Sequence, residues 1–424
     1  MSTNFIRILK IATLVTFSLT VSLVAFLFLE LISSILVSNN LDRLQDILRL
    51  LQQDSVLFWK QKSNLDTEFQ NQKVVTNNIG FRCHNITEKN KKRIVCLGAS
   101  PTFGWGVKYE DTYPVVIEKI LKKNNIDIEV INAGEIGYSS YQGLNLLKNK
   151  ILDLKPDIIT VSYVINDIDK YRFFRSSILQ DNQLKPISKI FITISNIAQE
   201  SNFFKLIKQI VKNNISKKVQ YYGKNCNNQY NENRRVSMYD YEANLKEFIK
   251  IAKENNIKIF FIVMPVNLPK KKIITEEEKK EIDLLFKDFY NEFKQKKYTE
   301  AKDILSRILL IDKYNTKMYY YLGILAEKEN NIEFANEYFK KAKNYEIFDC
   351  ASISLKYNDI MRKVAYNNKV DLCDCAKEFF SYDGDYLFVD PKYDCFHPNN
   401  KGHKIIATTV VKNIINYLKE AKYV

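Results

Sequence analysis

Short apolar runs and amphipathic segments alternate along most of this chain. The apolar runs predict strands at Arg93–Leu97, Glu129–Asn132, Asp157–Tyr163, Lys258–Met264 and Val370–Cys373. Apolar residues at helical spacing predict helices at Tyr113–Lys123, Tyr141–Leu154, Asp240–Asn255, Ser354–Asn367 and Lys401–Lys419. This alternation predicts an α/β fold, in which helices cover both faces of a parallel sheet.

The amino-terminal region carries a much longer apolar run, from Ile11 to Val37, which is broken only by Ser, Thr and Glu30. About 20 helical residues cross a hydrocarbon core of about 30 Å, so this run predicts a single-pass membrane anchor. Arg7 and Lys10 precede it without an acidic residue, which favours a cytoplasmic N-terminus and an extracytoplasmic (periplasmic or extracellular) remainder. A cleaved signal peptide is the alternative, although no A-x-A site ends the run.

A lead-in segment and a first insertion flank the early strands. Leu41–Trp59 repeats Leu and Ile at helical spacing, which predicts an amphipathic helix that leaves the membrane. The insertion Tyr171–Arg235 is basic and contains an apolar helical run from Ile187 to Val211. We expect it to form either a lid or wall over the site, or a packed surface helix.

A second insertion, from Leu268 to about Asp349, has an internal repeat. Ala301 and Ala335 lie 34 residues apart, and the second unit places small and aromatic residues at the positions of a tetratricopeptide repeat: Tyr319, Leu322, Gly323, Ala326, Ala335, Phe339 and Ala342. Fewer than about three repeats rarely fold alone, so the insertion needs the rest of the chain, an added helix such as Glu276–Phe286, or a partner. It predicts a protein-docking module or a plain helical hairpin.

Composition narrows the classes of partner. The chain has 424 residues, enough for two or three units, and 46% of them are hydrophobic. The net charge is +15, but the lysines are scattered among Asn and Ile and form no stripe interleaved with aromatic residues. We therefore expect no nucleic-acid partner. Affinity for an anionic polymer or membrane surface stays an alternative.

Cysteine spacing indicates neither a metal site nor a cofactor. The seven cysteines are an odd number, and Cys373-Asp374-Cys375 does not have the spacing of a zinc ribbon. Cys395 could pair with Cys373 or Cys375 in an oxidising compartment. Free buried thiols are the interpretation that we favour.

Two distant segments carry candidate chemistry. The first predicted strand ends in Gly98-Ala99-Ser100, at the edge of the sheet where α/β folds bind ligands. Asp394 and His397 lie three residues apart in a loop that ends at a proline. A serine hydroxyl needs a base to become a nucleophile, and the base needs a third group to orient it. The other histidines are poorer candidates for the base, because His84 follows no carboxylate motif and His403 lies in the last predicted helix.

At these residues the sequence resembles the SGNH (GDSL-type) hydrolase family. The resemblance runs through four blocks in the family's order: Gly98–Ser100 with Thr102–Gly106, Asn132–Ser139, Val164–Asp167 and Asp394–His397. It implies a three-layer α/β/α, flavodoxin-like fold. It also implies that Ser100 is the nucleophile, His397 the general base and acid, and Asp394 its orienting partner. The implied oxyanion hole consists of the backbone N–H of Ser100, the backbone N–H of Gly137 and the side-chain amide of Asn166.

The chain departs from the family pattern at two positions. Ala99 stands where the family has the Asp of Gly-Asp-Ser, and Val164 stands where it has a Gly in the third block. The lost Asp is not the family's triad carboxylate. The β-branched Val164 stiffens the segment that carries Asn166. An Asn-x-Gly-Phe-Arg lead-in, Asn78–Arg82, is similar to one found before the hydrolase domain of membrane-anchored members.

These observations predict a chain of five successive segments: an anchor at 1–40, a lead-in at 41–90, the first part of the hydrolase domain at 91–267 with a lid-like insertion at 171–235, a helical insertion at 268–349, and the second part of the hydrolase domain at 350–424. The resemblance implies a membrane-anchored serine esterase that needs no cofactor. Its ester substrate could be an acylated glycan, a cell-envelope polymer or a lipid. Two alternatives stay open: an O-acetyltransferase of extracellular polysaccharide that uses the same triad, and an inactive scaffold that binds a protein partner through the helical insertion.

Overall fold

The computed structural model describes residues 3–36, 43–86, 88–168, 172–174, 179–207, 234–267, 274–379, 381–382, 384–390 and 394–423. The chain forms two compact units. The first combines Met1–Ser55 with Pro186–Tyr222, and the second combines Val56–Lys185 with Gly223–Val424. The candidate chemistry lies entirely in the second unit.

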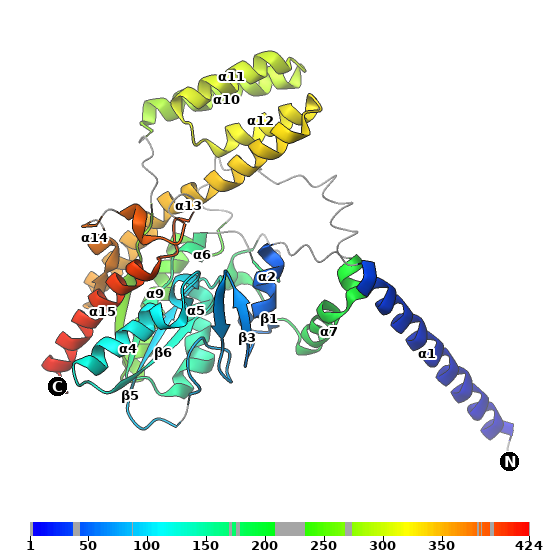
Figure 1. The fold of residues 1–424 in the computed structure, drawn as a ribbon, viewed down its shortest axis with the longest axis horizontal. Coiled ribbons are helices and arrows are strands. Elements are labelled where there is room, and N and C mark those ends of the chain that lie inside the picture. The colour runs from blue at the N-terminus through cyan, green and yellow to red at the C-terminus, as the bar shows by residue number, and fades with distance from the viewer. Residues whose placement is uncertain are drawn as a thin grey trace. The chain divides into compact units, whose positions relative to one another are not determined.

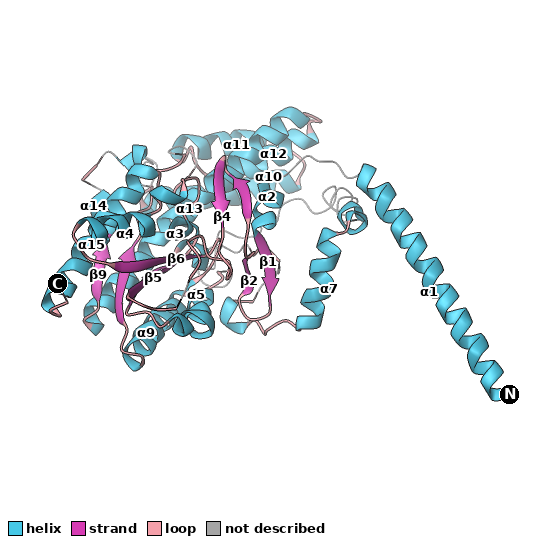
Figure 2. Ribbon diagram, turned by 60° about the horizontal axis from the view of Figure 1, so that its bottom comes forward, coloured by secondary structure: helices cyan, strands magenta, loops and turns pink. Residues whose placement is uncertain are grey.

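The second unit is built around a five-stranded parallel sheet with the strand order β6-β5-β7-β8-β9 (Figure 2). The strands are β5 (Lys92–Gly98), β6 (Ile128–Gly134), β7 (Ile158–Ser162), β8 (Lys258–Val263) and β9 (Asp371–Asp374). In chain order this is the flavodoxin-like arrangement, in which ligands bind at the carboxyl edge beside the first strand. All five predicted strands are confirmed, and so is the parallel α/β fold.

Helices cover both faces of this sheet (Figure 1). The helices around the sheet are α3 (Ser100–Phe103), α4 (Tyr113–Lys123), α5 (Ser140–Leu146), α6 (Ile165–Ile168), α9 (Met238–Glu254), α13 (Ile332–Asn368), α14 (Cys375–Phe379) and α15 (Asn400–Glu420). On one face, α4 packs on β6 and α15 packs on β9, and the two helices share a buried cluster that includes Ile94 and Cys96 of β5. On the other, α9 packs with α5 and α13, and its Tyr241 hydroxyl donates to the Tyr163 carbonyl at 2.6 Å. The three-layer prediction is confirmed.

Two predicted helices differ from the observed ones. The segment Tyr141–Leu154 is not one regular helix, because α5 ends at Leu146 and continues as a π turn (Leu147–Ile151) and a 3-10 turn (Leu152–Leu154). The predicted helix Ser354–Asn367 is only the last part of α13. The predicted domain boundary between residues 349 and 350 therefore falls inside a helix.

The lead-in was wrongly predicted as one helix. Helix α2 covers only Arg43–Leu50, and it is followed by short strands, β1 (Leu51–Asp54) and β2 (Phe58–Gln61). Further along, β3 (Asp66–Phe69) and β4 (Gln72–Val75) form an antiparallel hairpin that the sequence did not predict. Its two turn residues, Gln70 and Asn71, both have positive φ, the conformation for which hairpins usually use glycine. Without a glycine, the turn lacks the strongest sequence signal of a hairpin.

The first unit contains the apolar amino-terminal helix α1 (Thr3–Leu36) and helix α7 (Lys189–Glu200). Residues 13–34 of α1 are long and apolar enough to cross a membrane, with a mean hydropathy of 2.2. The predicted helical run Ile187–Val211 is confirmed in part, as α7 and a further helical turn at residues 202–207; residues 208–211 lie outside the described residues.

The second insertion is helical, as predicted. It consists of α10 (Glu276–Lys294), α11 (Tyr298–Ile311), α12 (Thr316–Lys328) and the first part of α13, and each of these helices packs on the next. Their shared core includes Ala301, Leu322 and Ala342, which are three of the repeat positions. The added helix predicted at Glu276–Phe286 is the first part of α10, which begins with a capping box at Thr275 and Glu278.

Candidate active site

Ser100 lies at a sharp turn between a strand and a helix. Strand β5 ends at Gly98, and α3 begins at Ser100. A side chain at Gly98 would collide with the hydroxyls of Thr102 and Ser162, so only glycine allows the chain to turn here. Ser100 is 7% exposed, so its side chain is largely buried at the carboxyl edge of the sheet.

The structure brings Ser100, His397 and Asp394 into one hydrogen-bonded chain. Ser100 Oγ lies 2.8 Å from His397 Nε2, across 297 positions of sequence. His397 Nδ1 lies 2.8 Å from Asp394 Oδ2 and 3.0 Å from Oδ1. This is the geometry of a nucleophile, a base and an orienting carboxylate.

Asp394 is held in its ionised form. Its burial alone would raise its pKa, but the charge and hydrogen bond of His397 and the backbone N–H groups of Phe396 and His397 lower the pKa below its usual value. Both N–H groups donate to Oδ1, at 2.9 and 3.0 Å. A fixed carboxylate of this kind holds the imidazole in one tautomer, with its proton on Nδ1 and a free lone pair on Nε2 facing Ser100.

Backbone hydrogen bonds hold the histidine loop in place. Val389 N–H donates to the His397 carbonyl at 2.9 Å, and Asn399 N–H donates to the Leu387 carbonyl at 2.8 Å. Asn267 N–H, just after β8, donates to the Cys395 carbonyl at 2.8 Å. No disulfide is needed for this, since Cys395, Cys373, Cys375, Cys83 and Cys96 are all free buried thiols. The favoured prediction of free thiols is confirmed for these five.

An aromatic pair that the sequence alone did not reveal supports the imidazole. Trp105 is 6% exposed, and its ring is stacked on the ring of His397. Phe69, from the unpredicted hairpin, meets the Trp105 ring edge-on at 4.7 Å between centroids. Trp105 stands in the first resemblance block, so its position was visible in the sequence, but its role was not.

The expected oxyanion donors follow the carboxyl ends of three adjacent strands, β6, β5 and β7. In the sheet register Gly98 of β5 is level with Gly134 of β6 and with Ser162 of β7. The Ser100, Gly137 and Asn166 segments follow these positions at the same edge. Asn166 Nδ2 donates to the Tyr138 carbonyl at 3.1 Å, which ties the Asn166 segment to the neighbour of Gly137 and leaves its second N–H for a ligand.

Gly137 has a positive φ of 79°, and a phenyl ring from Phe173 lies where a side chain would be. Both facts require glycine at this position. Among the described residues, no hydrogen bond uses the Gly137 N–H. The geometry agrees with an anion-binding N–H, and the three-donor hole itself stays a prediction.

A buried ion cluster braces the Gly137 turn from behind. Arg235 Nη1 donates to the Gly137 carbonyl at 2.7 Å, and Arg235 Nη2 lies 2.9 Å from Asp181 Oδ2. Arg172 Nε lies 2.7 Å from Asp181 Oδ1, and Ser139 Oγ donates to Oδ2 at 2.6 Å. Burial would raise the pKa of Asp181, but the two guanidinium groups lower it. All three charged residues come from the two ends of the insertion predicted as a lid, and none of them was predicted.

The middle of the insertion 171–235 belongs to the first unit, not to the unit that holds the site. Residues 186–222 group with the amino-terminal helix in the first unit. The described ends of the insertion, around Arg172, Asp181 and Arg235, stay in the second unit. The ends therefore form the support of the Gly137 turn, and a lid over the site stays a prediction.

Two buried carboxyls lie close behind the site. Burial raises the pKa of Glu135, next to the Gly137 turn, to about 7. Burial likewise raises the pKa of Asp167, beside Asn166, to about 7. Asp167 Oδ1 accepts from the backbone N–H of Ser140 at 2.9 Å and from its hydroxyl. Glu135 Oε2 accepts from Gln61 N–H at 3.0 Å.

The two remaining histidines have structural surroundings. His84 Nε2 lies 3.1 Å from Glu129 Oε1, a partner that the sequence did not predict. His403 is fully buried, and its Nδ1 accepts from Tyr113 N–H at 3.1 Å. Burial, with nearby Arg82, lowers the pKa of His403 to about 3, so its ring stays neutral. Neither replaces His397. Within the described part of the chain, no cluster of His, Cys, Asp and Glu could hold a metal ion.

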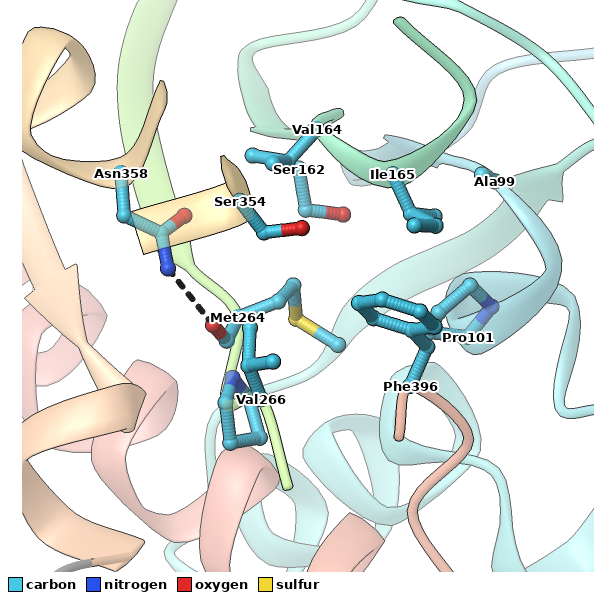
Figure 3. Close-up of a pocket in the computed structure, with 11 residues that line it drawn as sticks. Ala99, Pro101, Ser162, Val164, Ile165, Met264, Val266, Ser354, Asn358 and Phe396 are labelled. Carbon is cyan, nitrogen blue, oxygen red and sulfur yellow. Dashed lines mark hydrogen bonds between the residues drawn. The ribbon is translucent and has the colours of Figure 1, made fainter. Parts of the chain in front are cut away.

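A pocket opens beside Ser100 (Figure 3). It is small, with a cavity volume of about 20 Å³, and it is partly open to solvent. Ala99 and Pro101, the neighbours of Ser100, line it on one side, and Ser354 and Asn358 of α13 line it on the other (Figure 3). Its remaining wall is apolar: Val164, Ile165, Met264, Pro265, Val266 and Phe396, with the hydroxyl of Ser162.

Comparisons with known proteins give distant likenesses only. No protein-family model and no curated protein matches the chain. Among solved structures, a lipase/acylhydrolase from Enterococcus faecalis is 12% identical, with 76% of this chain and 95% of that chain covered and a TM-score of 0.36. An alpha/beta hydrolase from the metagenome of Lake Arreo is 13% identical (76% and 94% covered, TM-score 0.38). An acetylxylan esterase from Geobacillus stearothermophilus is 11% identical (78% and 96% covered, TM-score 0.37). Likenesses of this size do not establish the activity of this chain, which has to be argued from its own geometry.

Proposed function

We propose that this chain is a membrane-anchored serine esterase of the SGNH type. The observation that carries the proposal is the hydrogen-bonded chain from Ser100 Oγ through His397 to Asp394. Ser100 follows the end of β5, at the edge of the parallel sheet where this fold class binds ligands. The supporting geometry is local to that edge: the glycine turn, the Gly137 and Asn166 segments, and the pocket.

In the proposed reaction, Ser100 Oγ attacks the ester carbonyl carbon while its proton passes to His397 Nε2. The oxyanion that forms is stabilised by the N–H groups of Ser100 and Gly137 and by the Asn166 amide. Donors of this kind are worth about 3–4 kcal/mol each in other hydrolases. Asp394 stays ionised and stabilises the imidazolium. The C–O bond to the alcohol then breaks, and the alcohol oxygen takes the proton from Nε2.

The second half of the reaction removes the acyl group from Ser100. A water molecule gives a proton to His397 Nε2 and attacks the acyl carbonyl. The bond to Ser100 Oγ breaks, Oγ regains the proton, and the carboxylic acid leaves. A sugar hydroxyl in place of water would give an acyltransferase by the same steps.

The anchor and the helical insertion suggest where such an enzyme would work. Helix α1, with its positive amino-terminal flank, would hold the catalytic unit at the outer face of a membrane. Ester substrates that are themselves fixed there, such as an O-acylated glycan, a cell-envelope polymer or a lipid, suit an enzyme on a tether. The tetratricopeptide-like helices α10–α13 would dock a protein partner.

The test is labelling of the full chain in detergent with a fluorophosphonate serine probe, together with hydrolysis of p-nitrophenyl acetate. Ser100→Ala and His397→Ala should abolish both signals. Ser381→Ala, an exposed serine on the surface, should change neither. If well-folded wild-type protein neither reacts with the probe nor hydrolyses the ester, the esterase proposal is wrong. If it reacts but turns over only when a polyol acceptor is added, it is a transferase.

A further inference from the structure

The pocket beside Ser100 has a polar end that the reaction itself does not use. Asn358 is 1% exposed, and its Nδ2 donates to the Met264 carbonyl at 3.2 Å. This bond fixes the orientation of the amide, because only its nitrogen can donate to a carbonyl. Its oxygen, Oδ1, then faces the side of Ser354 (Figure 3). In the described part of the chain Oδ1 is buried and accepts no hydrogen bond.

The pocket suits the acyl part of an ester better than the alcohol part. Ala99 and Pro101 flank the nucleophile at one end, and α13 closes the other. Val164 and Ile165, which precede the expected oxyanion donor Asn166, form part of its wall. The alcohol of a polymer must continue outward from the surface, so the small pocket takes the smaller group.

A largely apolar wall that ends in a buried acceptor without a partner, Asn358 Oδ1, is selective in a definite way. A buried acceptor without a donor is unfavourable, and a ligand that supplies the donor removes that cost. A site built to accept a hydrogen bond therefore rejects an otherwise identical ligand that lacks the donor. We propose that this pocket binds a short acyl chain that carries a hydroxyl group, which donates to Asn358 Oδ1. This inference rests on the proposed esterase function.

The experiment compares matched p-nitrophenyl esters on the full chain in detergent: lactate with propionate, and 3-hydroxybutyrate with butyrate. At least one hydroxyacyl ester should have a kcat/KM about tenfold above that of its deoxy partner, the size expected for one buried hydrogen bond. Asn358→Leu, which keeps the volume of the side chain, should bring that ratio close to one. Because the ratio is measured within one preparation, partial unfolding of the variant does not change it.

Three results are decisive. Equal rates for the hydroxyacyl and deoxy esters in the wild type would mean that Oδ1 meets only water, and the inference would be wrong while the esterase function stood. A preference that survives Asn358→Leu would also overturn it. Absence of any Ser100-dependent turnover would overturn both. Ser381→Ala serves as the control that keeps the wild-type ratio.

A second, independent observation concerns the first unit. Glu30 lies inside the apolar helix α1, and its carboxylate is fully engaged by another segment of the chain. Ser201 Oγ donates to Oε2 at 2.6 Å, Asn202 N–H donates to Oε1, and Phe203 N–H donates to Oε2 at 3.0 Å. These are the unpaired N–H groups at the start of the helical turn 202–207, so Glu30 caps it. The Phe26 and Phe203 rings meet edge-on beside this contact.

The segment that Glu30 holds exposes apolar side chains. On α7, Ile190, Phe191 and Ile194 are 73%, 61% and 61% exposed. The opposite side of α7 is in contact with the rest of the unit, since Ile192 is buried and Ser195 Oγ accepts from Gln53 Nε2 at 2.7 Å. Phe204 and Ile207 extend the apolar surface into the next turn, at 44% and 40% exposed. Such a surface next to a membrane-spanning helix fits lipid.

We infer that α7 and residues 202–207 lie in the membrane interface, with this apolar face in the acyl boundary of the bilayer. Lipid is the occupant because the surface is continuous with α1 through Glu30 and Phe26. The same contacts explain why a carboxylate is tolerated near one end of a membrane span: its charge meets backbone donors there. This inference rests on the proposed anchoring by α1.

The test is tryptophan fluorescence of the full chain in phosphatidylcholine–phosphatidylglycerol vesicles that contain brominated acyl chains. Phe191→Trp should add emission that is blue-shifted and quenched by bromine. Tyr239→Trp, at an exposed site of the second unit, should add emission that bromine does not quench. If the Phe191→Trp variant resists carbonate extraction and its added emission is not quenched, the interface inference alone is overturned. Extraction by carbonate would overturn the anchoring as well.

Discussion

The indole ring of Trp105 lies nearly parallel to the imidazole of His397, with 5.0 Å between ring centroids and 20° between ring planes. One face of the base is thus covered by a flat, buried surface, and its Nδ1 edge is held by Asp394. The stacking fixes the plane in which Nε2 can meet Ser100. Positioning of this kind acts on the chemical step more than on substrate binding.

Trp105→Leu should therefore lower kcat about tenfold, with KM changed less than twofold, because the reacting groups lose alignment while the pocket is intact. Trp105→Phe keeps an aromatic face and should lose much less. Steady-state hydrolysis of p-nitrophenyl acetate measures both. A purely structural role would lower the amount of active enzyme equally in both variants, so active-site titration with the fluorophosphonate probe separates the two cases.

Arg235 and Arg172 offer a matched pair of variants. Both bind Asp181, but only Arg235 also donates to the Gly137 carbonyl. Breaking either buried pair should lower the free energy of unfolding by about 3–5 kcal/mol. Only Arg235→Met should also lower the kcat of the folded fraction, by about tenfold to a hundredfold, because the Gly137 donor moves. Equal kcat losses in Arg235→Met and Arg172→Met would show that Arg235 has no special role at the turn.

Glu135 makes the stability depend on pH. The unfolded carboxyl loses its proton near its ordinary pKa of 4.5, but the folded one keeps it up to about 7. A group with a raised folded pKa lowers the free energy of unfolding as pH rises between these two values. Glu135→Gln removes this loss, so it should gain roughly 1–3 kcal/mol relative to wild type between pH 4.5 and pH 7. Urea unfolding at a series of pH values measures the gain.

Glu129 is the contrast for that experiment. Burial would raise its pKa, but hydrogen bonds from His84 and Arg93 lower it below the ordinary value. Its contribution to stability is therefore present above the unfolded pKa and lost in acid. Glu129→Gln should destabilise the protein more at neutral than at acidic pH. If the stability gain from Glu135→Gln is the same at every pH, the Glu135 carboxyl of the folded protein is ionised throughout, and the prediction for Glu135 is wrong.

Met264 tests whether the pocket beside Ser100 takes the acyl group. It lines the pocket just after β8, whereas Ile262, two residues earlier, belongs to the same buried cluster but does not line the pocket. Both Ala variants should lose about 2–5 kcal/mol of stability. Only Met264→Ala should raise kcat/KM for p-nitrophenyl hexanoate relative to acetate, by roughly tenfold for the space of a few methylenes. The same change in Ile262→Ala would place the acyl chain elsewhere.

The sequence predicted the parts of this molecule that are encoded by neighbouring residues. Strands appear as apolar runs, and Ser100, Asp394 and His397 stand in recognisable local surroundings. The brace of Arg235 on Asp181 and Gly137 was missed because it joins residues that are far apart in sequence and only the fold brings them together. The β3–β4 hairpin was missed because its turn, Gln70-Asn71, contains no glycine.

The boundary at residue 349 failed for a different reason. The segment around Cys350 contains no proline or glycine, so nothing in it ends a helix. Two patterns that look separate, the repeat positions Ala335 to Ala342 and the amphipathic stretch after Ser354, are successive parts of one helix. Periodicity alone does not show whether two helical segments are joined.

The continuity of α13 from the helical insertion into the hydrolase-like unit has an evolutionary consequence. Each residue turns an α-helix by about 100°, so the faces that Ala342 and Asn358 present are locked in phase by the number of residues between them. A single-residue insertion or deletion between Ala342 and Asn358 would break this phase. Either Ala342 would turn away from the core of the helical insertion, or Asn358 would turn away from the pocket. Loops elsewhere in the helical insertion can lengthen or shorten freely. The helical insertion therefore cannot be removed as a separate module, because its last helix continues into the wall of the pocket beside Ser100.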